Sequence, residues 1–587
     1  MPNVISNGHS GFERGAWDRP PYGRSIVLSL QLEHDPGTEF LRGKFVEVIV
    51  CERPATLHGL RERSTAAPRN WPTSAHSRTY LKFVLFALCA TLYLLPFMRP
   101  LWKATDEGTI VYGAVRVVHG QVFGRDFFEV MGPGSFYWLA AFFKIFGVTF
   151  LAERICLFVT SLGTGLSIYF LTRRLCGKYQ ILPAILMVGV SFSTIWPMVN
   201  HHTDSNFFAL LAVVCVVLWQ DKGSSFLLVA GGALAAVTTC ILQPKGILLL
   251  LGFLIWLGIE YWRHSAPLSA PSIMLTSYLG VIAAILVYFW AQGALRDLLY
   301  MNLIWPWQNY GVVNTVPYAT GISQFWTHWT LPIHGIRWLL PVGLVLITPF
   351  ALVALLPALV PALGLGFGKE NLKPQILLYW FCAWALWLSE FHRRDIAHLA
   401  SGSPLLIILC VYFLTRYEGR PADLVLQFLA LSAGALATVN LFIVLCARPV
   451  QTRVGEVAMF KADPVLTFLD GHTKPGEEIF SYPYCPMYYF LSGTTNPTRY
   501  SLLIYNYNTP SQFDEVIRVL DRHKVKYVVW DASFQEKAAA TFFTATMYRP
   551  AGGFLMEPYL KSHYKVVQDI DGIRIMERKA NDNAASQ

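Results

Sequence analysis

The stretch KATDEGTIVYGAVRVVHGQVFGRDFFEVMGPGSF, residues 103–136, is the segment on which the predicted architecture of this chain depends. It opens with the adjacent acids Asp106 and Glu107, carries another acid at Asp126, and holds almost no long apolar run. A hydrophobic block precedes it and many more follow it. An acidic, glycine-punctuated segment in so apolar a chain needs a structural or functional reason.

The composition is that of an integral membrane protein. Of the 587 residues, 54% are hydrophobic and 14% are charged, and the mean hydropathy is +0.41. Soluble domains carry about 25% charged residues, so this deficit argues against an ordinary soluble protein. The net charge of +10 could suit a nucleic-acid partner, but much of the excess lies in the N-terminal region and in short loops. Membrane orientation accounts for charge placed there, and we expect no nucleic-acid partner.

The N-terminal region, residues 1–79, is polar and rich in Arg, Pro, Gly and Ser. It has no apolar run that could form a signal-peptide core beside a cleavage site. We expect a mostly disordered cytoplasmic region. The alternative is that an upstream start codon adds residues that the working protein does not need.

Apolar runs then dominate residues 80–447. A membrane-spanning helix needs ~20 mostly apolar residues, and the run at 136–146 is too short to span comfortably. By this criterion the sequence predicts about eleven spans, which lie near 80–98, 153–172, 180–198, 204–220, 225–242, 245–262, 273–292, 338–362, 375–391, 398–416 and 424–447.

The charges of the connecting loops set the expected orientation. With the N-terminus in the cytoplasm, every later cytoplasmic loop carries Lys or Arg, as the positive-inside rule requires. An odd number of spans leaves residues 448–587 outside, on the side of the membrane opposite to the N-terminus, and makes residues 99–152 an outer loop. The predicted cytoplasmic loops are 173–179, 221–224, 263–272, 363–374 and 417–423.

The C-terminal segment, residues 448–587, is too polar to span a bilayer and is predicted to be a small α/β domain. Thr509 and Pro510 are typical of a helix N-cap and first position, and the apolar residues that follow repeat at helical spacing. VKYVVW is typical of a strand, and Asp571-Gly572 of a hairpin turn. The tyrosine-rich YPYCPMYYF stretch could cover a site or bind sugar, but a packed core is the favoured interpretation.

Polar residues converge at the predicted outer ends of four helices. Ionisable groups at membrane depth are costly and usually functional. A carboxylate can take a proton from a hydroxyl, and cations can hold a phosphate. The arrangement therefore predicts group transfer at the water–lipid boundary. The residues are Asp106, Glu107, Arg116, His119, Arg125, Asp126, Glu129, His201, His202, Asp204, Lys245, His392, Arg393, Arg394, Asp395 and His398.

Simpler interpretations stand beside this one. Asp106 could cap a helix that begins at Gly108, and Glu107 could favour the dipole of that helix. Arg393 and Arg394 could extend toward lipid head groups. The pair His201 and His202 could be boundary residues rather than metal ligands.

The order of these motifs resembles the GT-C superfamily of polyprenyl-phosphate-sugar glycosyltransferases, and most nearly its protein O-mannosyltransferase and lipid A aminoarabinose transferase branch. One span is followed by a long outer loop opening with Asp106-Glu107, a juxtamembrane helix, and GRDFFEVMGPGSFYWL. Asp204 in HHTDSNFFALL, Lys245 in QPKGILLLL and the basic stretch EFHRRDIAHLASGSPLL then match in order. The resemblance covers residues 80–450. Members often have His-Pro-Pro where this chain has residues 132–134, Gly-Pro-Gly, which leaves the role of that position open.

The resemblance implies an inverting transferase that moves a sugar from a polyprenyl-phosphate donor to an acceptor hydroxyl on a glycolipid, polysaccharide or protein. Such an enzyme would lie in a bacterial inner membrane, with residues 448–587 in the periplasm. Asp106 would be the general base with Glu107 beside it, and Asp204 would orient the acceptor or help hold a divalent metal. The alternatives are a flippase for lipid-linked sugars and a related polysaccharide polymerase or ligase. The expected substrate-binding residues are Arg125, Asp126, Lys245, Arg393, Arg394 and His398, and the candidate ligands of a metal, if there is one, are Asp106, Glu107, His201, His202 and Asp204.

Overall fold

The computed structural model describes residues 73–102, 105–310, 315–318, 340–365, 374–417, 419–505, 507–534 and 555–580. The expectations for residues 1–72, for residues 311–314 and 319–337 of a predicted outer loop at 293–337, and for residues 366–373 of the predicted cytoplasmic loop at 363–374 lie outside these ranges. The first helix, α1, begins at Thr73, so the N-terminal region gives way to helix seven residues before the predicted boundary at residue 80.

Apolar helices occupy every run that was predicted to span the membrane. Among the described residues, eight helical stretches are long and apolar enough to cross a membrane. A ninth passes the same test as a pair bent by 71°, formed by α15 (Ile396–Gly402) and α16 (Pro404–Arg416). The shorter apolar helices α7 (Ser225–Ile241) and α14 (Pro374–Leu388) fill the remaining two runs. The prediction of a polytopic α-helical membrane protein is confirmed. The described residues hold eight or nine stretches of spanning length and not the predicted eleven, because α7 and α14 are shorter than a full span.

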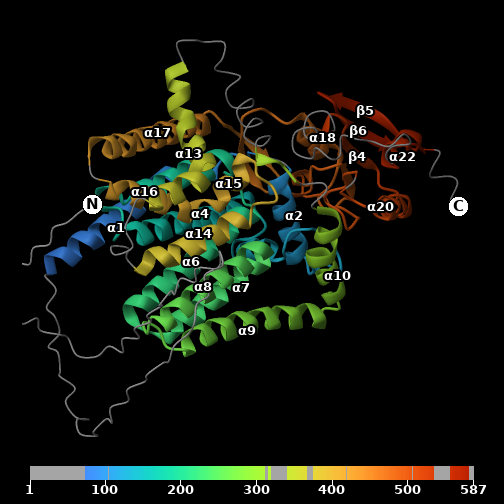
Figure 1. Ribbon diagram of the computed structural model, residues 1–587. Helices are drawn as coiled ribbons and strands as arrows, with labels where there is room; N and C mark the ends of the chain where they lie inside the picture. Colours follow the sequence, from blue (N-terminus) through green and yellow to red (C-terminus); the bar gives the residue numbers. More distant parts are fainter. Residues whose placement is uncertain are drawn as a thin grey trace, which may run out of the picture. The chain divides into compact units, whose positions relative to one another are not determined.

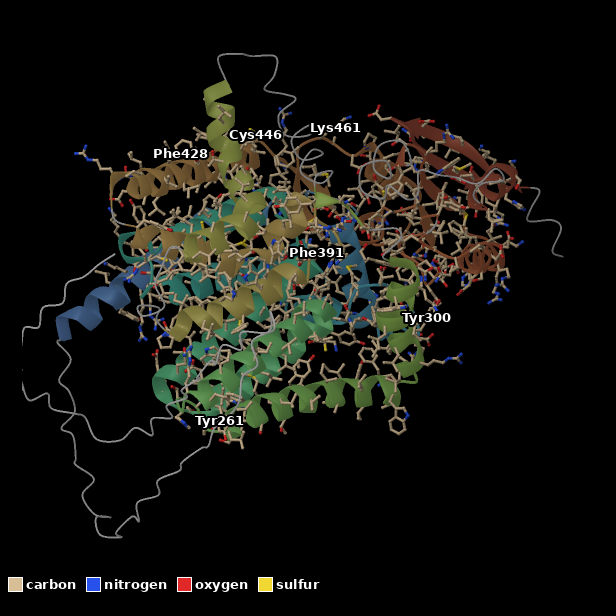
Figure 2. All side chains as sticks on the ribbon, in the orientation of Figure 1. Tyr261, Tyr300, Phe391, Phe428, Cys446 and Lys461 are labelled. Carbon is tan, nitrogen blue, oxygen red and sulfur yellow. The ribbon has the colours of Figure 1, made fainter. Side chains whose placement is uncertain are left out.

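The helical part runs from α1 to α17, and several of its long helices lie roughly parallel in Figure 1. Large apolar side chains on its surface stay exposed, among them Tyr261, Phe391 and Phe428, as expected of surfaces that face lipid (Figure 2). The helices are α1 Thr73–Leu94, α2 Asp106–Val118, α3 Gly134–Phe146, α4 Phe150–Thr172, α5 Leu182–Met187, α6 His201–Lys222, α7 Ser225–Ile241, α8 Gln243–Trp262, α9 Ser269–Ala291, α10 Leu295–Leu299, α13 Leu340–Leu365, α14 Pro374–Leu388, α15 Ile396–Gly402, α16 Pro404–Arg416 and α17 Arg420–Leu445.

The opening stretch of the outer loop forms α2. The helix begins at Asp106, with Thr105 at the N-cap, so the alternative in which Asp106 caps a helix from Gly108 is wrong. The carboxylate of Asp106 is held by a tyrosine from the C-terminal segment instead of by the backbone of its own helix. The short run at 136–146 forms α3, with 13 residues, which agrees with the prediction that it is too short to span.

The C-terminal segment combines helices with two small sheets. Thr509 caps α20 with a capping box in which Gln512 reaches back, as the sequence predicted for this helix start. The hairpin turns at Asp571 and Gly572, where Ile570 pairs with Ile573. The larger sheet has the order β3-β4-β6-β5, with only β3 and β4 parallel. The elements are β1 Arg448–Thr452, β2 Gly455–Met459, α18 Pro464–His472, β3 Ile479–Tyr482, α19 Met487–Leu491, α20 Pro510–His523, β4 Tyr527–Asp531, α22 Met556–His563, β5 Tyr564–Ile570 and β6 Ile573–Arg578.

The C-terminal segment shares one hydrophobic core with α2 and α3. Gly108 of α2 lies directly against α19, because a Cβ at this position would come within 2.3 Å of the backbone nitrogen of Met487. The backbone N–H of Asn496 donates to Tyr112 Oη over 2.7 Å. The tyrosine-rich stretch is therefore largely packed core, and it fixes the helix end that carries Asp106 and Glu107.

Candidate functional site

Asp106 lies half-buried at the first position of α2, where its carboxylate meets the C-terminal segment. Tyr484 Oη donates a hydrogen bond to Asp106 Oδ1 over 2.8 Å, and Thr109 Oγ1 donates to the same phenol oxygen over 3.2 Å. Burial, with the nearby Asp106 charge adding to it, raises the pKa of Tyr484 well above its usual value. The phenol therefore stays protonated and holds one carboxylate oxygen of Asp106.

Glu107, Glu153, Arg154 and Asp204 form a second arrangement, the acid cluster, between α2, α4 and α6. Arg154 Nη1 lies 2.7 Å from Glu107 Oε1, and Arg154 Nε lies 3.2 Å from Glu153 Oε2. All three of these side chains are fully buried. Burial raises the pKa of Glu107, and Arg154 opposes that rise. One guanidinium thus serves two carboxyl groups, and Glu107 is held in an ion pair.

Asp204 joins the acid cluster from the first turn of α6. Asn200 caps this helix by accepting the backbone N–H of His202 over 2.6 Å, which places Asp204 at the positive end of the helix dipole. The Asp204 side chain is buried beside Ser135 and Thr160. Among the described residues its Oδ2 has no hydrogen-bond partner. Asp204 is therefore a desolvated acid that lies beside two hydroxyl groups.

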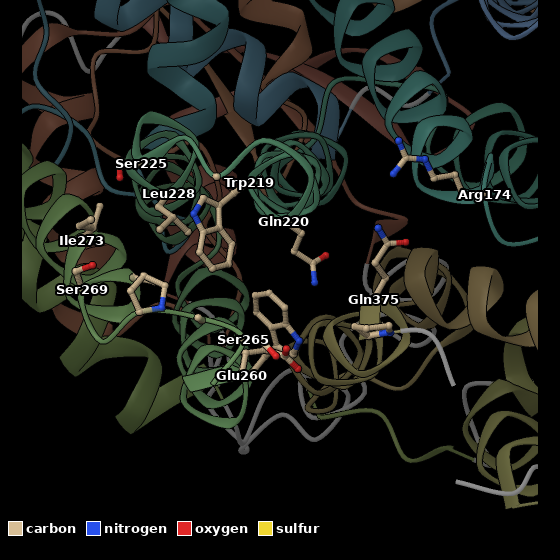
Figure 3. Close-up of a pocket in the computed structure, with 16 residues that line it drawn as sticks. Arg174, Trp219, Gln220, Ser225, Leu228, Glu260, Ser265, Ser269, Ile273 and Gln375 are labelled. Carbon is tan, nitrogen blue, oxygen red and sulfur yellow. The ribbon is translucent and has the colours of Figure 1, made fainter. Parts of the chain in front are cut away.

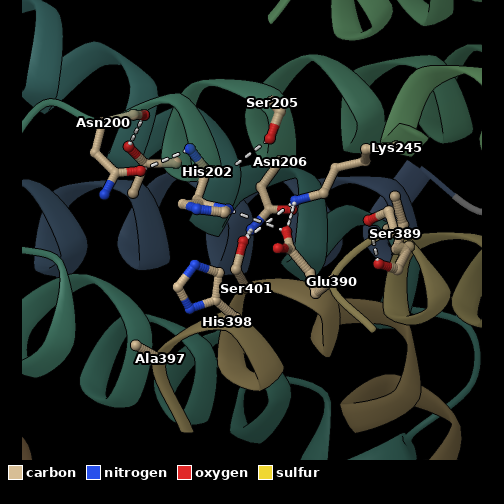
Figure 4. Close-up of polar contacts among 12 residues, drawn as sticks. Asn200, His202, Ser205, Asn206, Lys245, Ser389, Glu390, Ala397, His398 and Ser401 are labelled. Carbon is tan, nitrogen blue, oxygen red and sulfur yellow. Dashed lines mark hydrogen bonds and ion pairs between the residues drawn. The ribbon is translucent and has the colours of Figure 1, made fainter. Parts of the chain in front are cut away.

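The opposite side of the same turn faces a third arrangement, the histidine–lysine cluster. It consists of His202, Lys245, Glu390 and His398, which Figure 4 shows, and of Asp395, which contacts His398. Lys245 Nζ lies 2.8 Å from Glu390 Oε1 and also donates to Asn206 Oδ1 and Ser401 Oγ. His202 Nδ1 lies 3.1 Å from the same glutamate oxygen. Helices α6, α8 and α15 and the end of α14 are thereby joined by buried polar contacts.

Asp395 organises the outer part of the histidine–lysine cluster. It caps α15 by accepting the backbone N–H groups of Ala397 and His398. Its carboxylate also lies 2.8 Å from His398 Nδ1 and 2.9 Å from Arg393 Nε. Burial raises the pKa of Asp395, but His398 and Arg393 outweigh it and hold the value well below its usual range. Asp395 is thus an ionised anchor for two predicted substrate-binding residues.

Other predicted site residues lie apart from both clusters or at their edge. Arg125 and Asp126 form an exposed pair with each other at 2.8 Å, and hydrogen bonding to Arg125 lowers the pKa of Asp126. Arg394 lies over the ring of Phe391 at 4.4 Å. His201 stacks at an angle against the His202 ring, with 4.1 Å between ring centroids.

Four residues of these arrangements were missed from the sequence: Glu153, Arg154, Glu390 and Tyr484. Glu390 lies inside the apolar run at 375–391, and Glu153 and Arg154 begin the run at 153–172. Charged residues in such runs are themselves a signal of function, so the first three could have been found. Nothing local marks Tyr484 as a partner of Asp106.

A cavity of about 670 Å³ lies elsewhere (Figure 3). It is lined by Trp219, Trp256 and Glu260 from the C-terminal ends of α6 and α8, and by Gln375 at the start of α14. These are the helix ends opposite to those that carry His202, Lys245 and Glu390. The cavity therefore does not belong to the predicted site.

Comparisons with known proteins identify the fold. The sequence matches no protein-family model and no curated protein. The structure is similar to two structures of ArnT from Cupriavidus metallidurans, one bound to undecaprenyl phosphate and one in the apo state. The TM-score is 0.50 to each, and the sequence identities are 12% and 13%, respectively. Each match covers 86% of this chain and 99% of the ArnT chain. Arabinofuranosyltransferase AftD from Mycobacteria follows with a TM-score of 0.43 and 10% identity, over 86% of this chain and 42% of that one. The likeness to ArnT shows the GT-C fold that the order of motifs predicted.

Proposed function

We propose that this chain is a membrane glycosyltransferase that takes a sugar from a polyprenyl-phosphate donor and passes it to an acceptor hydroxyl at the outer face of a bacterial inner membrane. The observation that carries the proposal is the first turn of α6. Asp204 faces the acid cluster from this turn, and His202 faces the histidine–lysine cluster. Carboxylates suited to an acceptor and cations suited to a phosphate therefore flank one helix end. ArnT, whose fold this chain shares, has been observed with bound undecaprenyl phosphate.

Asp106 is the proposed catalytic base. Its Oδ1 is occupied by the Tyr484 phenol, which leaves Oδ2 to accept a proton. Glu107 is held by the buried Arg154 and is a positioning residue rather than a second base. The acceptor oxygen loses its proton to Asp106 and bonds to the anomeric carbon, while the bond from that carbon to the phosphate oxygen breaks. A single displacement of this kind inverts the anomeric centre.

The basic stretch at 392–398 is the proposed donor-phosphate site. Arg393 is held by Asp395 through Nε over 2.9 Å, which fixes its guanidinium beside the start of α15. Arg394 lies beside it, and both can stabilise the charge that develops on the departing phosphate. Lys245 is the third cation of the proposed site, and its Nζ is held 2.8 Å from Glu390 Oε1. The leaving group is the polyprenyl phosphate.

Donor consumption tests the class of activity. Proteoliposomes containing the full chain are supplied with polyprenyl-phosphate donors radiolabelled in the sugar, together with an extract of cell-envelope acceptors. Sugar transfer that depends on the protein is the expected result. Movement of intact labelled lipid across the bilayer, without loss of sugar, would overturn the proposal in favour of a flippase.

A further inference from the structure

His202, Glu390 and His398 bring three metal-ligating side chains together in the interior of the protein. One donor atom from each lies within 4.8 Å of the donor atoms of the other two, and all three residues are buried. The metal candidates expected from the sequence were Asp106, Glu107, His201, His202 and Asp204. Of these, only His202 belongs to a group of three possible ligands among the described residues.

Glu390 has one carboxylate oxygen available for a further ligand. Its Oε1 lies 2.8 Å from Lys245 Nζ and 3.1 Å from His202 Nδ1. Its Oε2 is buried and has no hydrogen-bond partner within the described part of the chain. A buried carboxylate oxygen without a partner is costly, and a cation bound to it would remove that cost.

The partners of the three candidate ligands are those expected around a bound ion. A metal-ligating histidine usually directs its other ring nitrogen to a carboxylate or carbonyl, and ligating carboxylates are themselves hydrogen bonded. Asp395 Oδ1 lies 2.8 Å from His398 Nδ1, which leaves Nε2 of that ring for an ion. Lys245 holds Oε1 of Glu390 and is itself held by Asn206 and Ser401.

The spacing fits a small ion with tetrahedral geometry. Zinc bonds to His nitrogen and carboxylate oxygen of ~2.0–2.1 Å place neighbouring tetrahedral ligands ~3.4 Å apart. The donor atoms of the three residues already lie within 4.8 Å of one another, and the rings of His202 and His398 meet edge to face with 4.7 Å between centroids. Little movement would be needed to close the group around an ion.

We propose that His202, Glu390 and His398 form a site for a divalent cation of the zinc type. Two imidazoles and one carboxylate are a ligand set that suits Zn²⁺ and disfavours Mg²⁺ or Ca²⁺, which prefer oxygen ligands. The fixed charges of Lys245 and Arg393 are cancelled by those of Glu390 and Asp395, so a bound ion leaves the cluster positive. The site does not depend on the proposed transferase activity.

Metal binding by the full chain tests the proposal directly. Protein in detergent micelles is freed of metal with a chelator and titrated with Zn²⁺ against a chromophoric competitor, and with Co²⁺ to record its visible spectrum. The expected result is one Zn²⁺ per chain, an intense Co²⁺ spectrum typical of tetrahedral coordination, and no competition by Mg²⁺. Uptake of less than about one tenth of an equivalent by the wild-type chain would overturn the proposal.

Variants locate the ion. His398→Ala should lose the high-affinity ion, and Asp395→Asn should weaken binding about 10- to 100-fold by releasing the ring of His398. His472→Ala is the matched control, because His472 is an exposed histidine at the end of α18, and it should bind as the wild type does. Equal zinc affinity in all the variants would overturn the assignment. If His398→Ala does not fold, Asp395→Asn and the wild-type Co²⁺ spectrum decide.

Discussion

Replacing Arg154 by methionine is predicted to destabilise the protein far more than the same replacement of Arg174. The two arginines lie at opposite ends of α4, and each has a terminal nitrogen 2.7 Å from a carboxylate oxygen. Arg154 and its two partners are fully buried, whereas the side chains of Arg174 and Asp221 are 52% and 27% exposed. The distances are the same, and the pairs differ in their exposure to water.

The expected magnitude follows from that difference. Removing one partner of a buried ion pair costs about 3–5 kcal/mol, since it leaves a buried charge uncompensated. Arg154→Met leaves two such carboxyl groups, Glu107 and Glu153, so the upper part of that range applies. An exposed pair contributes ~0–1 kcal/mol, and Arg174→Met should fall there. The ratio of folded to unfolded protein should therefore drop by roughly a thousandfold or more for Arg154→Met alone.

Unfolding in mixed micelles, followed by circular dichroism, measures both variants against the wild type. Neutralising the stranded acids should restore much of the loss, so Arg154→Met combined with Glu107→Gln and Glu153→Gln is expected to be more stable than Arg154→Met alone. Equal losses in Arg154→Met and Arg174→Met would refute the reasoning, because burial would then have no energetic consequence for this contact.

Two other predictions concern the junction of α2 with the C-terminal segment and the loop between α2 and α3. Gly108→Ala should loosen that junction and lower both stability and transfer, because the new Cβ would meet the Met487 backbone at 2.3 Å. The control is Gly280→Ala in α9, where a new Cβ would find nothing within 4 Å. This variant should be neutral or stabilising in the same unfolding assay. Burial raises the pKa of Glu129 to about 8 from a usual 4.5, so the folded state favours the protonated carboxyl. Protonation of Glu129 therefore stabilises the folded state. The contribution to stability is complete below about pH 4.5 and is lost as the pH rises through 8. The denaturant concentration at the midpoint of unfolding of the wild type should therefore decrease as the pH rises from 5 to 8. Glu129→Gln should make this midpoint less dependent on pH, and an unchanged pH dependence in that variant would contradict the assignment.

Much of the fold follows from local physical rules that the sequence displays openly. A spanning helix must bury its backbone polar groups and present apolar side chains to lipid, so each of the eleven runs could be found from hydropathy alone. The capping box at Thr509 and Gln512 and the turn at Asp571-Gly572 are equally local. In each case the residues that determine the structure are neighbours in sequence.

The contacts of the site are of another kind, because their partners lie far apart in the chain. Tyr484 reaches Asp106 across 378 positions, and Glu390 reaches His202 across 188. Hydropathy and spacing carry no information on such pairs. Asp126 shows the converse: it lies within the same acidic stretch as Asp106, yet it pairs with its neighbour Arg125 on the surface. Membership of a polar stretch is therefore insufficient to place a side chain in the site.

The most direct test of the central claim is the rate of sugar transfer from a polyprenyl-phosphate donor by Asp106→Asn, compared with wild type and with Asp126→Asn, in proteoliposomes of equal protein content. Asparagine keeps the size of Asp106 and can still accept a hydrogen bond from Tyr484, but it cannot take the acceptor proton. Removal of a positioned base is expected to lower the rate by about 10²- to 10⁴-fold, whereas Asp126→Asn should transfer at nearly the wild-type rate. Near-wild-type transfer by Asp106→Asn would contradict the account, since the base would then have to be another group.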